Sequence, residues 1–234
     1  MRLETAYDFV DCLSGMRFAD VFNPYSDICA ACDLPQAPDI RRCNLVSVLD
    51  SILRNGVATI WIGRDLGYRG GRRTGLALTD ELHLVACAEL LGSRPLHRAT
   101  HGPAIAEPTA RIVWDLLNET RSPVLLWNVF PFHPHSPEHA LTNRTHTRME
   151  AEACHHLLAW LLERLAPRYV VAIGGHARST LGRLDIEALA VRHPSYGGKA
   201  DFLSSMRDFR RSAEVRSGER STAEDFKDQD VPER

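Results

Sequence analysis

The sequence lacks any apolar stretch long enough to cross a membrane, and it has no excess of charge of either sign. Its 234 residues are 44% hydrophobic and 25% charged, with a formal net charge of −2. Because a membrane-spanning helix needs roughly 20 apolar residues, we expect no membrane partner. The N-terminal residues are charged and amphipathic, so we also expect no signal peptide and a cytoplasmic location. The charge balance excludes a generally polybasic nucleic-acid binder, so any attraction for phosphate must come from a local cluster.

Cysteine is also sparse, and its spacing does not predict a disulfide framework. A cytoplasmic chain with six cysteines is expected to hold them as reduced thiols or metal ligands. Several histidines lie between residues 133 and 156, but their spacing does not match a tetrahedral zinc site. We therefore predict no metal site and no cofactor.

Four short apolar runs predict the strands of a sheet, at 57–62, 124–128, 169–173 and 189–192. Helical patterns lie between them, at 82–91, 110–120, 145–165 and 176–184. This alternation predicts an α/β fold, a three-layer α/β/α sandwich with a central four-stranded, mostly parallel sheet. The length suits one core, so residues 1–209 are predicted to form a single domain that ends in a helix at 200–209. Residues 210–234 are charged and nearly free of apolar side chains, and we predict a disordered tail there.

A glycine-rich, cationic loop follows the first predicted strand. It holds glycines at 63, 67, 70, 71 and 75, and one acid, Asp65, among the arginines Arg64, Arg69, Arg72 and Arg73. In α/β sheets such a loop is where anionic ligands bind, because its backbone N–H groups and positive charge face the ligand. The loop therefore predicts a ligand site, and the single carboxylate inside it predicts chemistry there.

Two other strands also end in polar residues. Asn128 is the last residue of the second strand, and His193 follows the fourth. Ligands of open α/β sheets bind beyond the carboxyl ends of the strands, so we expect Asp65, Asn128 and His193 to converge.

These three positions resemble the motifs of the uracil-DNA glycosylase superfamily. The matching stretches are Gly63-Arg64-Asp65-Leu66-Gly67, Asn128 within Leu-Leu-Trp-Asn-Val-Phe-Pro, and His193-Pro194-Ser195, and the resemblance covers about residues 20–209. It implies a monomeric DNA repair enzyme of the bacterial nucleoid. Such an enzyme flips uracil out of single- or double-stranded DNA, hydrolyses its N-glycosidic bond and leaves an abasic site.

The chemistry of the three side chains agrees with this resemblance. A carboxylate at Asp65 suits an oxocarbenium-like sugar and can orient the attacking water. The amide of Asn128 offers one donor and one acceptor, which fit N3–H and O4 of uracil and mismatch cytosine. A neutral imidazole at His193 can donate to O2 as charge develops on the leaving base.

The resemblance implies further contacts around these residues. Expected base contacts come from Gly63, Leu78, Phe130 and Tyr68. Expected DNA contacts come from Arg64, Arg69, Arg72, Arg73, Ser195, Tyr196, Gly175 and Lys199. Tyr196 is either a wedge that fills the vacated base stack or a packed side chain.

Several features depart from the family pattern. Leu66 stands where most members have proline, and Gly67 stands where the uracil-only members have a tyrosine that excludes the thymine methyl group. Other deaminated bases are therefore also expected substrates. The arginine-rich stretch of the members that bond covalently to the abasic sugar is missing. Cys29, Cys32 and Cys154 match three of the four ligands of the iron–sulfur members, but residues 128–153 contain no cysteine, so we expect buried thiols instead.

Two other functions remain open at this point: a catalytically inactive module that binds uracil or DNA, and a hydrolase of free nucleotides that uses the same pocket. Each site residue also has a structural interpretation. Asp65 would be a loop carboxylate paired with its arginine neighbours, Asn128 a strand-end turn residue, and His193 a packed or capping histidine.

Overall fold

The computed structural model describes residues 3–225, and the chain divides into two compact units, one up to Ala190 and one from Val191. We describe each unit separately. The boundary falls inside the region predicted as a single domain. No helix among the described residues is long and apolar enough to cross a membrane.

The first unit is built on a four-stranded sheet in the order β3-β2-β5-β6. The strands are β2 (Thr59–Asp65), β3 (Val124–Phe130), β5 (Tyr169–Ile173) and β6 (Leu189–Val191), and the last residue of β6 belongs to the second unit. The central strand β2 pairs in parallel with both β3 and β5. Its central residues Ile60, Trp61 and Ile62 are buried in succession, as in a strand covered on both faces. This confirms the predicted α/β fold with a mostly parallel sheet.

The paired strands run further than predicted, and this extension carries the polar residues into the sheet. In the β2–β3 register Gly63 lies opposite Asn128, and Asp65 lies opposite Phe130. Asp65 is therefore a strand residue rather than a loop residue, and Asn128 lies inside β3 rather than at its end. Backbone pairing with the neighbouring strand holds them, so their side chains have well-defined directions.

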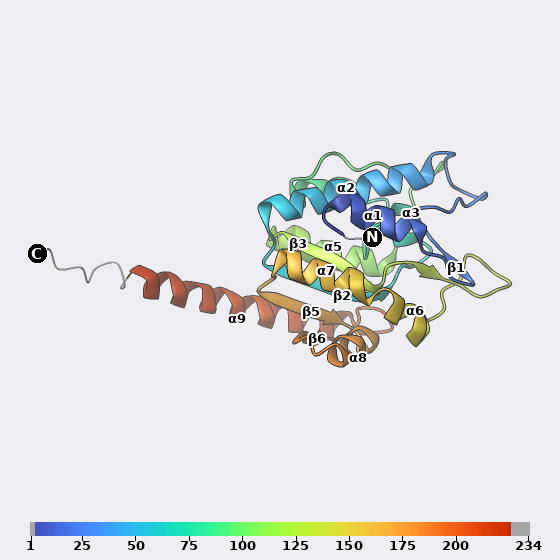
Figure 1. Cartoon of the computed structure of the whole chain (residues 1–234). Helices are drawn as coiled ribbons and strands as arrows, with labels where there is room; N and C mark the ends of the chain where they lie inside the picture. Colours follow the sequence, from blue (N-terminus) through green and yellow to red (C-terminus); the bar gives the residue numbers. More distant parts are fainter. Residues whose placement is uncertain (1–2, 226–234) are drawn as a thin grey trace, which may run out of the picture. The chain divides into compact units, whose positions relative to one another are not determined.

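Helices flank the sheet of the first unit (Figure 1). Their bounds are α1 (Ala6–Gly15), α2 (Ala37–Asn55), α3 (Gly71–Thr74), α4 (Leu84–Leu91), α5 (Pro108–Thr120), α6 (Arg148–Ala153), α7 (His155–Leu165) and α8 (Gly175–Arg183). Helix α8 packs on β5, β2 and β3, while α2 packs on α1, α4 and α7. A short antiparallel pair, β1 (Val21–Phe22) with β4 (His133–Pro134), completes this unit.

Local sequence explains where several helices begin and end. Thr5 with Asp8 and Thr147 with Glu150 form capping boxes at the starts of α1 and α6, satisfying N–H groups that the helix itself leaves unpaired. The single helix predicted over 145–165 is interrupted at Cys154, which separates α6 from α7.

The second unit contains the loop from His193 to Gly198 and helix α9, which spans Lys199–Asp225. Phe202 and Met206 on its first turns are buried. The helix starts as predicted but runs past residue 209, through the first part of the predicted tail. No proline occurs between residues 195 and 231, and alanine, glutamate and arginine favour a helix there. Residues 226–234 of the predicted tail lie outside the described residues.

Candidate active site

Asp65 is the last residue of β2, and its side chain is only 6% exposed. Its Oδ2 accepts a hydrogen bond from Arg64 Nε at 2.8 Å, and it lies 3.3 Å from His146 Nδ1 and 3.4 Å from the His146 backbone nitrogen. All of these contacts use the same oxygen. Among residues 3–225, Oδ1 is left without a hydrogen bond. The carboxylate is thus fixed on one side and available on the other.

The sequence analysis did not predict His146 as a site residue. Its side chain is 5% exposed, and its ring lies 5.5 Å from that of Phe130. The only sequence signal is its position just before the α6 capping box, which says nothing about contact with β2.

The side chain of Asn128 is buried, with the residue 1% exposed, and neither its Oδ1 nor its Nδ2 has a hydrogen-bond partner among the described residues. The amide lies against the bare backbone of Gly63. A Cβ at position 63 would lie 2.5 Å from Asn128 Oδ1 and 3.6 Å from the methyl carbons of Leu78. We call Gly63, Leu78 and Asn128 the amide pocket.

A buried amide without partners is costly, by about 1–3 kcal/mol for each unpaired group. Native proteins rarely keep such a group unless a ligand, ion or water satisfies it. Because Gly63 has no side chain, the amide of Asn128 can lie close to its backbone. The amide pocket can therefore bind a planar group that presents one donor and one acceptor.

The arginines of the glycine loop fall into two classes. Arg64 is one-third exposed, and exposed Arg69 lies 5.4 Å from the ring centroid of Tyr68. Arg72 and Arg73, in contrast, are 4% and 6% exposed. Protein groups already occupy both guanidinium groups, so we do not carry the predicted DNA contacts of these two residues further.

Arg72 is held between two elements of the small sheet. Its guanidinium lies 3.7 Å from the ring centroid of Phe22, and Nη1 is 2.9 Å from His133 Nδ1 and 3.1 Å from Ala140 O. Burial, and then the charge of Arg72, lower the pKa of His133 to about 4. The imidazole is therefore neutral at neutral pH, with Nδ1 accepting from Arg72 and Nε2 donating to the carbonyl of Thr142.

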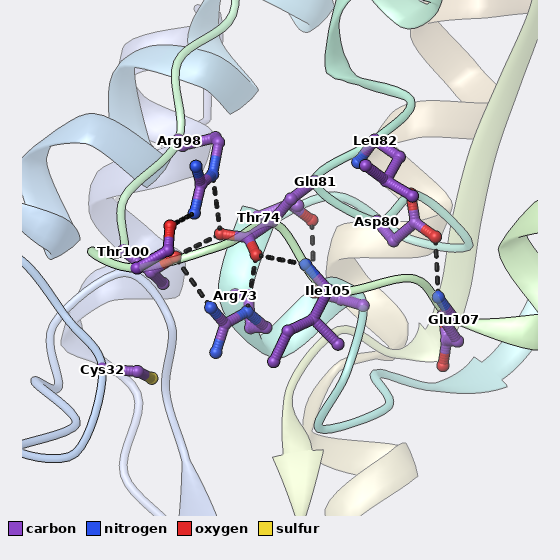
Figure 2. Close-up of polar contacts among 12 residues, drawn as sticks. Cys32, Arg73, Thr74, Asp80, Glu81, Leu82, Arg98, Thr100, Ile105 and Glu107 are labelled. Atoms are coloured by element: carbon purple, nitrogen blue, oxygen red, sulfur yellow. Dashed lines mark hydrogen bonds and ion pairs between the residues drawn. The ribbon is translucent and has the colours of Figure 1, made fainter.

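Arg73 belongs to a buried network around Glu81 (Figure 2). It donates to Glu81 Oε2 at 2.8 Å and to Thr100 Oγ1 at 2.8 Å. Thr100 and the backbone N–H of Ile105 also donate to Glu81. This network ties the glycine loop to the segment before α5, so its role is structural.

The aromatic candidates differ in their surroundings. Phe130 is fully buried, and its ring packs against Phe18 and Phe132 at 5.3 Å as well as against His146. Tyr68 is half-buried, and its backbone N–H donates to Asn143 Oδ1 at 3.1 Å. Both lie next to Asp65, Phe130 across the sheet and Tyr68 along the chain.

The remaining candidates are placed as follows. Gly175 is the exposed first residue of α8. In the second unit, Nδ1 of His193 accepts a hydrogen bond from the backbone N–H of Ser195 at 3.2 Å. Tyr196 is 99% exposed and has a φ of 52°, and Lys199 is the exposed first residue of α9.

The cysteines show no metal arrangement. Cys29 and Cys154 are buried, Cys32 is half-buried, and all six cysteines are free thiols. No cluster of three or more potential metal ligands occurs in the described part of the chain.

A parallel α/β sheet with a carboxylate and a buried amide near the ends of adjacent strands is typical of proteins that bind a ligand beyond their strand ends. The profile of the uracil DNA glycosylase superfamily matches residues 62–213, and the chain belongs to this family. Membership supports glycosylase activity on DNA.

Comparison with solved structures agrees with this assignment. The crystal structure of wild-type Pedobacter heparinus SMUG2 is similar with a TM-score of 0.59 and 12% sequence identity, covering 92% of this chain and all of that one. At this identity the likeness shows the fold. Comparison with curated proteins gives no match.

Proposed function

We propose that the protein excises uracil from DNA by hydrolysis, after flipping the nucleotide out of the helix, and leaves an abasic site. The observation that carries this proposal is the buried, unpartnered amide of Asn128 in the amide pocket. The family assignment indicates the class of reaction, and this amide indicates which nucleobase is recognised.

Uracil presents an N3–H donor next to an O4 acceptor, which is the complement of a side-chain amide. Cytosine presents an acceptor and a donor in the same places, so with the amide held in one orientation both contacts would be repulsive. A site built around a buried hydrogen-bonding group discriminates strongly, because the wrong ligand leaves that group unpaired. Burial of the amide therefore supports discrimination against the normal base from which uracil arises.

Asp65 is the proposed catalytic carboxylate. Cleavage of the glycosidic bond leaves positive charge on the sugar, and a fixed negative charge beside it stabilises that state. The contacts from Arg64 and His146 to Oδ2 hold the carboxylate in place. Oδ1 is then the oxygen proposed to orient the attacking water.

His193 is the proposed donor to uracil O2. Because Nδ1 accepts from the Ser195 backbone, a neutral ring carries its proton on Nε2. That tautomer has a donor ready for the charge that develops on the departing base.

DNA contacts are proposed for Arg64, Arg69, Gly175, Ser195, Tyr196 and Lys199. The near-complete exposure of Tyr196 supports a role as the wedge that fills the vacated stack. Gly67 stands where the uracil-only members have a tyrosine, so other deaminated bases are proposed as further substrates. We also propose that the protein acts as a cytoplasmic monomer.

The test uses labelled oligonucleotides that carry a single uracil, followed by alkaline cleavage of abasic sites. Asp65→Asn and His193→Ala should each lower the single-turnover rate by a factor on the order of 100 or more. Asp115→Asn and His176→Ala make the same chemical changes at exposed positions and should leave the rate unchanged. Circular dichroism checks that all four variants fold.

Rates that are unchanged in both site variants would refute the assignment of Asp65 and His193. Tight binding of uracil-containing DNA without any abasic product would instead select the inactive binding module. Release of base from free nucleotides alone would select the nucleotide hydrolase.

A further inference from the structure

Glu107 brings a second carboxyl group against the glycine loop. It is the N-cap residue of α5, yet its side chain makes no capping hydrogen bond to that helix. Instead, a Cβ at Gly67 would collide with Oε1 of Glu107, and a Cβ at Gly70 would collide with Oε2. The carboxyl group therefore fills the space that side chains at positions 67 and 70 would occupy.

Buried contacts fix this position. The backbone N–H of Glu107 donates to Asp80 Oδ2 at 2.7 Å, as Figure 2 shows. Asp80 is fully buried; its Oδ1 accepts from the backbone N–H of Leu82 at 3.0 Å and lies 2.6 Å from His83 Nδ1. Since Asp80 follows Leu78 by two residues, Glu107 is tied to the segment that forms one wall of the amide pocket.

The glycine loop that contacts Glu107 is directly connected to Asp65, the proposed catalytic carboxylate. Gly67 follows Asp65 by two residues, and the backbone N–H of Leu66 between them is held by Phe132 O at 3.0 Å. The carboxyl group of Glu107 thus touches a loop anchored at Asp65, while its backbone is anchored next to Leu78. It lies at the edge of the same site.

The charges around Glu107 come from three elements. Burial, and then the negative charge of Asp80, raise its pKa to about 7; Arg69 opposes this shift, and Asp65 adds a smaller upward contribution. Asp80 precedes α4, Asp65 ends β2, and Arg69 lies in the glycine loop. Near neutral pH the group therefore exists as a mixture of neutral acid and carboxylate.

The proposed function decides which edge of the base faces this carboxyl group. Within the first unit, N3 and O4 of uracil are assigned to Asn128 and the sugar to Asp65. The C5–C6 edge of the ring then remains for the glycine loop, where position 67 has no side chain of its own.

We propose that Glu107 is a specificity-determining residue, whose carboxyl group replaces a side chain at position 67 as the wall that rejects a 5-methyl group on the base. This inference rests on the proposed function. A methyl group pressed against a buried carboxyl group removes hydration without returning a hydrogen bond, and the cost is larger for the ionised form. Rejection of thymine should therefore strengthen as the pH rises through neutrality.

The test measures binding and does not need chemistry. Oligonucleotides carry one non-hydrolysable 2′-fluorinated nucleotide with either uracil or thymine, and fluorescence anisotropy gives both Kd values from pH 5.5 to 8.5. The wild-type ratio of thymine Kd to uracil Kd should rise with pH. In Glu107→Ala this ratio should fall by about tenfold or more at pH 8, which is the discrimination that a single methyl contact typically gives.

Glu107→Gln keeps the shape and cannot ionise, so its ratio should stay above that of the alanine variant but become independent of pH. Glu119→Ala, an exposed change on the same helix, should behave as wild type. An alanine variant with an unchanged ratio, or a glutamine variant that still responds to pH, would overturn the inference.

Cleavage of ordinary uracil-containing DNA by the same preparations separates the two proposals. If the protein cleaves uracil-containing DNA but the ratio of the two Kd values is the same in all variants at position 107, only the proposed role of Glu107 is overturned. If the ratio of the two Kd values changes with the residue at position 107 but no DNA is cleaved, the role of Glu107 is supported and the catalytic proposal is refuted. Equal binding of uracil and thymine by the wild type overturns the wall.

Discussion

Gly63 and Asn128 face each other across the β2–β3 pair, so closely that a Cβ on Gly63 would lie 2.5 Å from Asn128 Oδ1. Among the described residues, the amide has no hydrogen-bond partner that would keep it in place if a side chain were added at position 63. The first prediction follows from this contact.

Gly63→Ala should displace the amide by several tenths of an ångström and lower the rate of uracil excision by a factor on the order of 100. Because β2 is paired on both sides, the fold should survive. Single-turnover rates and the melting temperature of the variant measure the two effects. Gly182→Ala, a helical glycine with open space around its Cβ position, is the matched control. A variant with wild-type rates would show that the base does not use this amide.

Asn128→Leu should abolish uracil excision and at the same time make the protein more stable. Leucine has the same branching as asparagine and removes two buried groups that lack partners, so the free energy of unfolding should rise by about 1–3 kcal/mol. Uracil excision should fall to background. Urea unfolding and the excision assay measure these two outcomes. Asn118→Leu, a control at an exposed position, should have a free energy of unfolding within about 0.5 kcal/mol of wild type. A less stable Asn128→Leu variant would mean that the amide has a structural partner in solution.

The sheet and the strand-end residues were predictable because their signals are local. Apolar runs mark the strands, and parallel strands bring Asp65 and Asn128 to one edge by topology alone. The burial of Arg72 and Arg73 was not predictable, because their partners come from other segments of the chain: Phe22, Glu81, Thr100 and His133. A cationic sequence does not reveal whether its charges face solvent.

Glu107 was missed for the same reason. It lies between the helices predicted at 82–91 and 110–120, just before Pro108, where a glutamate is an ordinary helix-start residue. Its contact with Gly67 depends on how α5 docks against the glycine loop, and no local pattern encodes that docking. The glycine loop did carry one signal, since Gly67 leaves space that another part of the chain must fill.

His133 should make stability depend on pH in the acidic range. Its pKa is lowered from 6.5 to about 4, so the folded state prefers the neutral ring, while the unfolded state binds a proton below pH 6.5. The stability from the neutral ring is therefore complete above pH 6.5 and is lost as the pH falls toward 4. The loss amounts to about 3 kcal/mol at most.

Urea unfolding of the wild type and of His133→Asn at pH 7 and pH 4.5 measures this contribution. An asparagine oxygen can accept from Arg72 in place of Nδ1 without taking up a proton. The difference between the two pH values should therefore shrink in the variant and remain in His101→Asn, which changes an exposed histidine. An equal loss of stability in both variants would assign the acid sensitivity to other groups.

Gly67 and Glu107 should be energetically coupled. Gly67 does not have a left-handed φ, so alanine is tolerated by the backbone, and the only obstacle is the carboxyl group of Glu107. Gly67→Ala should weaken binding of uracil-containing DNA in the wild type but have little effect in Glu107→Ala, where the space is empty. The coupling energy in this double-mutant cycle should fall within about 0.5–3 kcal/mol, as for residues in contact. Gly15→Ala, with no atom near its Cβ position, gives the baseline for a glycine change. Effects that simply add would mean that the Glu107 side chain leaves position 67 when DNA binds, and the wall would then have to come from another residue.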